Sequence, residues 1–184
     1  MARVRPVFTP ADCPGNADAA TREGLAEFFE QLFPGNPDPR INEGHTGLAL
    51  AAHSPRFAGS LSRLTRSAVL EMKWSERRDL AELAVQAVNL HFRSSFSFET
   101  RMANAEATGL GMDRLAALPY WRTSSLFDEE QRLVLEYVEA VVTGEVADAL
   151  FERVRSRYGE QGTVELTALV GTFSLWAMLI NATL

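Results

Sequence analysis

Residues 79–101 read DLAELAVQAVNLHFRSSFSFETR, and this stretch decides the fold class of the chain. Apolar residues recur in its first half at the three- and four-residue spacing of an amphipathic helix. In its second half Ser94, Ser97 and Arg101 stand at i, i+3 and i+7, so on one helix they share a face. Glu82 lies twelve residues before Ser94, on the preceding helix. The stretch therefore predicts consecutive helices that carry an acid, two hydroxyls and a guanidinium.

Helical periodicity continues through the rest of the chain. Residues 18–33 carry an apolar stripe that ends before the prolines and glycine of FPGNPDP. Ser75 has the features of an N-cap, and Gly109 those of a left-handed helix end after a segment over about 95 to 108. Asp128 and Gln131 form a capping-box pattern. Since no stretch alternates apolar and polar residues, we predict an all-α, single-domain multi-helix bundle of about eight or nine helices.

Length and composition fit one domain. The chain has 184 residues, of which 46% are hydrophobic, enough to bury a substantial core. Residues 1–16 contain three prolines and a glycine and lack the apolar run of a secretory signal. We therefore expect an irregular N-terminal arm over 1–16, a single all-α domain over 17–184, and cytoplasmic residence. The single Cys13 excludes an internal disulfide.

Charge and motif content argue against several classes of function. A net charge of -6 argues against binding nucleic acid or an anionic membrane. The most apolar segment, 163–184, has about fifteen mostly apolar residues between Glu165 and Asn181, whereas roughly twenty are needed to span a bilayer. It predicts a buried or subunit-interface helix. The sequence has no His-x-x-x-His, Glu-x-x-His or cysteine cluster and no dinucleotide loop after a strand, so we expect no metal and no cofactor.

The stretch from Glu82 to Gly109 resembles the carboxymuconolactone decarboxylase and alkylhydroperoxidase D superfamily. The redox branch of that superfamily has a Glu, a Cys-x-x-Cys twelve residues later, and a His four residues after that. These positions are filled here by Glu82, Ser94, Ser97 and Arg101. The A-x-x-x-G-L pattern that follows in the family is matched by Ala105, Gly109 and Leu110. The resemblance extends from about residue 42 to the C-terminal NATL, and it implies helical protomers that assemble into dimers, trimers or hexamers.

The serines argue against the chemistry of the redox branch. There, a thiolate attacks peroxide and a second thiol resolves the product. A serine hydroxyl forms neither a sulfenic acid nor a disulfide, so thiol peroxidase activity is not expected. The decarboxylase branch lacks the cysteines and acts on a small anionic lactone, with a His at the position of Arg101.

The sequence leaves two functions open. The first is a cofactor-free, decarboxylase-like lyase acting on a small organic acid or lactone of aromatic catabolism. Glu82 would then transfer a proton, Arg101 would bind an anionic group through its planar fork, and Ser94, Ser97 and His91 would supply hydrogen bonds. The second is a non-catalytic ligand-binding or assembly scaffold, in which Glu82 and Arg101 form a structural salt bridge. An open polar pocket at this pair would favour the enzyme, and a closed pair without a cavity would favour the scaffold.

Overall fold

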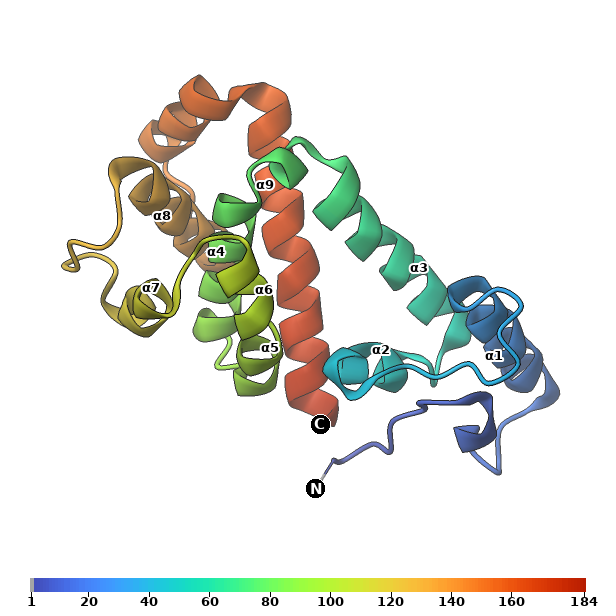
Figure 1. Ribbon diagram of the computed structural model, residues 1–184. Coiled ribbons are helices and arrows are strands. Elements are labelled where there is room, and N and C mark those ends of the chain that lie inside the picture. Colours follow the sequence, from blue (N-terminus) through green and yellow to red (C-terminus); the bar gives the residue numbers. More distant parts are fainter. Residues whose placement is uncertain (1) are drawn as a thin grey trace. The chain divides into compact units, whose positions relative to one another are not determined.

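The computed structural model describes residues 2–184, and in this range it is helical over 72% of the chain with no strand (Figure 1). The predicted all-α bundle of eight or nine helices is confirmed. The chain divides into two compact units, one running up to Thr65 and including Leu179–Leu184, the other Arg66–Met178. The division into an arm over 1–16 and one domain over 17–184 stays a prediction. Met1 lies outside the described residues, and the 3-10 turn η1 (Pro10–Asp12) is the helical part of residues 2–16.

The first unit contains three α-helices. Asp18 caps the first of them, because its side chain accepts a hydrogen bond of 2.7 Å from the Thr21 amide. Phe28 and Phe29 on this helix are buried, with their rings edge to face at 5.7 Å. After η1, the helices of the first unit are α1 (Ala19–Leu32), η2 (Glu43–His45), α2 (Thr46–Ala51) and α3 (Pro55–Arg66). The last residue of α3, Arg66, belongs to the second unit.

The second unit is built around α4 (Arg78–His91), which packs most extensively on α8 (Glu129–Thr143). Figure 1 shows α4 beside α9 (Asp148–Thr183), and all three helices supply fully buried aliphatic side chains to one core. Each buried side chain of this kind contributes roughly 1.5–3 kcal/mol. The remaining elements are η3 (Ser67–Glu71), η4 (Lys73–Glu76), α5 (Ser95–Thr100), α6 (Met102–Ala107), α7 (Met112–Ala117) and η5 (Leu118–Tyr120).

Two predicted helix ends are confirmed and one is wrong. Gly109 has a φ of 83°, and the Asp128–Gln131 capping box is formed. Ser75 is not the N-cap of α4, because it lies within η4 and the helix begins at Arg78. The buried indole of Trp74 donates a 2.7 Å hydrogen bond to the Gly162 carbonyl oxygen, and this contact fixes the chain in a separate turn ahead of the helix.

Helix α9 is interrupted at Gly159, which has a φ of 72° and a ψ of 175°. Beyond this point Leu166, Leu169 and Phe173 are buried in the core. Among residues 2–184, α9 is the one helix long and apolar enough to cross a membrane by length and composition. A core helix of a soluble protein passes the same test, and 44% of the most apolar window is buried.

Candidate functional site

The site begins with a buried acid on α4. Glu82 is 2% exposed, and Gln86 and Asn89 follow it at i+4 and i+7 on the same buried face. An ionised carboxylate at such a position requires charged or hydrogen-bonding partners. The fold supplies them from the segment that joins α5 to α6.

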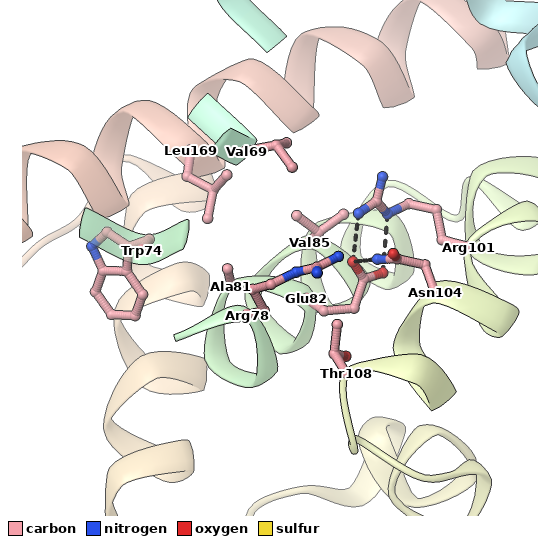
Figure 2. Close-up of a pocket in the computed structure, with 10 residues that line it drawn as sticks. All are labelled: Val69, Trp74, Arg78, Ala81, Glu82, Val85, Arg101, Asn104, Thr108 and Leu169. Carbon is pink, nitrogen blue, oxygen red and sulfur yellow. Dashed lines mark hydrogen bonds and ion pairs between the residues drawn. The ribbon is translucent and has the colours of Figure 1, made fainter. Parts of the chain in front are cut away.

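Arg101 and Asn104 bind both oxygens of Glu82 (Figure 2). The Arg101 Nε donates to Oε1 at 3.0 Å, and its Nη2 donates to Oε2. The Asn104 side-chain amide also donates to Oε2. A guanidinium that grips a carboxylate through two parallel bonds is a strong, geometrically specific pair. The structure thus brings the two candidate residues Glu82 and Arg101 into direct contact.

The chain reaches this geometry by breaking the helix that the sequence suggested over about 95 to 108. Helix α5 ends at Thr100, and α6 begins at Met102. Arg101 lies between them with φ and ψ of -98° and -2°. Its guanidinium lies over the Phe173 ring of α9, 4.9 Å from the centroid, which adds a cation–π contact.

The ion pair lines a partly open pocket of about 130 Å³. In Figure 2 the polar side chains of Glu82, Arg101 and Asn104 lie together, the apolar Val69, Trp74 and Leu169 lie away from them, and Arg78 and Val85 lie between the two groups. The lining residues are Val69, Trp74, Arg78, Ala81, Glu82, Val85, Arg101, Asn104, Thr108 and Leu169. An engineered apolar cavity of about 150 Å³ holds benzene, so this pocket accommodates a ligand body of about that size or smaller. Its chemistry suits a small molecule with an apolar body and a polar or anionic end.

Among the lining residues that the sequence did not suggest, Arg78 carries a charge and Asn104 an amide group. Arg78 stands four residues before Glu82 on α4, and Asn104 stands three residues after Arg101. Residues three or four positions apart lie on the same face of a helix, so Arg78 shares a face with Glu82, and Asn104 with Arg101. Helical periodicity could therefore have identified both residues. The break at Arg101 offered no comparable sign in the sequence.

The two serines, Ser94 and Ser97, do not line the pocket that contains Glu82. Ser94 precedes the first turn of α5, and its hydroxyl donates to the Ser97 hydroxyl at 2.9 Å. Both side chains are buried, and neither lines the pocket of Glu82. The Ser94 amide also donates to the Asn89 carbonyl oxygen at 2.8 Å, which ties the start of α5 to the end of α4. This arrangement favours a structural contact between the helices.

His91 is also separate from the ion pair. It is exposed at the end of α4, and its ring meets that of Phe92 edge to face at 5.0 Å. It lines a different pocket of about 200 Å³, together with Trp121 and Glu139. Within residues 2–184 no group of three or more His, Cys, Asp or Glu side chains is placed to hold a metal ion. Of the five predicted site residues, the structure brings Glu82 and Arg101 into one pocket.

Comparison with known proteins gives two partial similarities. No protein-family model matches the chain. It is 45% identical over 85 residues to the uncharacterized protein YnjA of Escherichia coli (strain K12), an alignment that covers 45% of this chain and 46% of YnjA. It is 24% identical over 102 residues to the uncharacterized protein YdfG of Bacillus subtilis (strain 168), covering 54% of this chain and 67% of YdfG. The chain thus matches about half the length of YnjA, and the names of these relatives state no activity.

Proposed function

We propose that this chain is a decarboxylase-like lyase of the carboxymuconolactone decarboxylase and alkylhydroperoxidase D superfamily, acting on a small organic acid or lactone of aromatic catabolism. One observation carries the proposal: the Glu82–Arg101 pair lines a partly open pocket of about 130 Å³ and is not sealed within the core. A buried carboxylate that a small molecule reaches is suited to moving a proton. Cytoplasmic residence and assembly into a homo-oligomer are part of the same proposal.

Arg101 has N–H donors that Glu82 does not use and that could bind a ligand. A guanidinium carries five N–H groups, and two of them are used on Glu82. The remaining N–H groups are available to a carboxylate or a lactone carbonyl oxygen in the pocket. Apolar contacts with Val85 and Leu169 would hold the body of such a ligand next to the polar wall.

Glu82 would transfer the proton. Its oxygens accept hydrogen bonds from Arg101 and Asn104, yet each carboxylate oxygen has two lone-pair directions. Oε2 already accepts from Arg101 and Asn104, so Oε1, which accepts one hydrogen bond, is the oxygen with a free lone pair, and a ligand bound beside Arg101 would place its acidic carbon or oxygen within reach of it. The two partners fix the carboxylate in one orientation, which lowers the cost of positioning it during reaction.

The test is the variant Glu82→Gln, compared with the natural chain in a screen of small carboxylic acids and γ-lactones. Substrate loss and product formation are followed by proton NMR. Glu99→Gln is the matched control, because Glu99 is an exposed acid on α5 outside the pocket. We expect Glu82→Gln to abolish turnover and Glu99→Gln to retain it, with both variants folded by circular dichroism. Unchanged turnover in a folded Glu82→Gln variant rejects the proposal.

A non-catalytic ligand-binding scaffold is the second candidate, and one feature favours it. Both oxygens of Glu82 already accept hydrogen bonds, as in a structural ion pair that locks α4 to the α5–α6 segment. A scaffold predicts acids that raise the melting temperature and are recovered unchanged from the NMR screen. A ligand at a hundred times its Kd adds about 2.7 kcal/mol to the free energy of unfolding, which a thermal-shift assay detects.

A further inference from the structure

We infer that Arg78 is the specificity residue of this pocket and that it selects a monocarboxylate with a ring no larger than benzene. The inference rests on the proposed function, since it names the substrate class of the same site. Three of the residues that line the pocket are charged: Arg78, Glu82 and Arg101.

The Glu82–Arg101 pair has no net charge to offer a ligand. The guanidinium and the carboxylate are joined by two hydrogen bonds and neutralise one another. Arg101 therefore contributes directional donors to the pocket but little attraction for an anion at a distance. A second cation is needed for the pocket to prefer an acid over its neutral amide or ester.

Arg78 is that cation. It makes no ion pair within residues 2–184, it is exposed, and it lines the pocket. Its position at i-4 from Glu82 places both side chains on one face of α4. In Figure 2 the Arg78 side chain extends from α4 toward the Glu82–Arg101 pair. With Arg78 included, the pocket carries one net positive charge. A ligand with one carboxylate neutralises this charge, whereas a dicarboxylate would leave one net negative charge.

The pocket's size limits the rest of the ligand. Its volume of about 130 Å³ is somewhat below the roughly 150 Å³ that holds benzene. A five-membered ring fits this space, with its apolar face toward Trp74 and Leu169. The carboxylate then lies toward the open side, where Arg78 is exposed. A five-membered ring with one carboxylate is therefore the ligand shape that size and charge favour together.

The experiment compares two probes of nearly equal shape, furan-2-carboxylate and furan-2-carboxamide, titrated into the full chain and followed by ligand-observed NMR. The affinity of each probe is measured without any need for turnover. We expect the natural chain to bind the carboxylate at least about tenfold more tightly than the amide, as one charge-assisted contact commonly provides. Arg78→Met should reduce carboxylate affinity about tenfold and leave amide affinity within about twofold.

Two further variants control the comparison. Arg78→Lys keeps the charge without the planar fork, so it should retain most of the preference for the carboxylate. Arg56→Met removes an exposed cation on α3 that does not line the pocket, so it should change neither affinity. Equal affinity for the two probes in the natural chain overturns the assignment. So does an Arg78→Met variant that keeps the preference, or an Arg56→Met variant that loses it.

The two proposals fail separately. If the carboxylate preference depends on Arg78 but Glu82→Gln leaves turnover unchanged, the lyase assignment fails and the Arg78 assignment stands. If turnover requires Glu82 but Arg78→Met binds both probes like the natural chain, the Arg78 assignment fails alone.

Discussion

Glu82 is a buried charge whose stability depends on its two partners. Removing one member of a buried ion pair costs about 3–5 kcal/mol, because the other charge is left without compensation. We expect Glu82→Leu to lower the free energy of unfolding by about this amount, and Arg101→Met by somewhat less, since Arg101 is 26% exposed. The double variant should be destabilised by less than the sum of the two. Urea unfolding of all four chains measures the coupling, and strictly additive losses would show that the pair is not energetically linked.

The candidate site residues show which features of a site can be predicted from sequence spacing and which cannot. Glu82 and Arg101 were both named as candidate site residues, and in the structure they form an ion pair. Ser94 and Ser97 also contact each other, but as a buried pair of hydroxyls outside the pocket. The shared face required an unbroken helix from Ser94 to Arg101. The chain ends α5 at Thr100 instead, so Arg101 takes a direction that periodicity does not predict.

At the scale of elements, Arg132 on α8 holds the loop that precedes its own helix. Its Nη1 donates to the carbonyl oxygens of Trp121 at 2.8 Å and Arg122 at 2.9 Å. Its Nε donates to that of Phe127 at 3.1 Å, and its Nη2 donates to that of Ser124. One side chain thus satisfies four backbone acceptors of a segment without regular structure. The sequence carries no sign of this role, because an Arg on a helix is usually a solvated residue.

We predict that Arg132→Met lowers the free energy of unfolding by about 2–3 kcal/mol, since hydrogen bonds to charged donors are lost and carbonyl groups lose their partner. Chemical denaturation measures the change. Arg153→Met is the control: Arg153 is 56% exposed and makes one ion pair of 2.8 Å with Glu136. Exposed pairs contribute up to about 1 kcal/mol. Equal effects of the two substitutions would argue against an anchoring role for Arg132.

Gly159 determines how α9 is divided. Its φ of 72° and ψ of 175° form a backbone conformation that residues with a Cβ avoid. A Cβ there would meet no atom within 4 Å, so the penalty of a substitution is conformational. We expect Gly159→Ala to lower the free energy of unfolding by about 1–3 kcal/mol. Gly15→Ala, also in open space but without a positive φ, should be close to neutral. Similar thermal melting of both variants would contradict this account.

Over the whole chain, local signals predicted element types better than element boundaries. The caps at Asp128 and Gly109 were correct because each depends on its own neighbours. The start of α4 was wrong because Trp74 bonds to Gly162, which is distant in sequence. Helix α5 likewise ends at Thr100, where the sequence suggested one helix over about 95 to 108. Tertiary contacts overrode local preference at these points.

Glu130 on α8 connects segments that are far apart in the sequence of the second unit. Arg77 donates to Glu130 at 3.1 Å, and Arg157 on α9 lies 2.9 Å from it. The Tyr158 hydroxyl donates to the same carboxylate at 3.3 Å. The hydrogen bond from Arg77, followed by that from Arg157, lowers the pKa of Glu130 below its ordinary value of 4.5. Burial of the Tyr158 hydroxyl, with the adjacent Glu130 charge, raises the pKa of Tyr158.

The lowered pKa makes a prediction about acid unfolding of the whole molecule. A carboxyl whose folded-state pKa lies below its unfolded value binds fewer protons when folded, so its contribution to stability is present above about pH 4.5 and is lost as the pH falls below it. We expect Glu130→Gln to be less stable than the natural chain near neutral pH and to have a flatter stability curve below pH 4.5, because the titrating group is absent. Urea unfolding at a series of pH values measures both curves. Glu145→Gln, at an exposed position, should reproduce the natural curve. Parallel curves for Glu130→Gln and the natural chain through the acid range would show that this ion pair does not link α8 to α9 energetically.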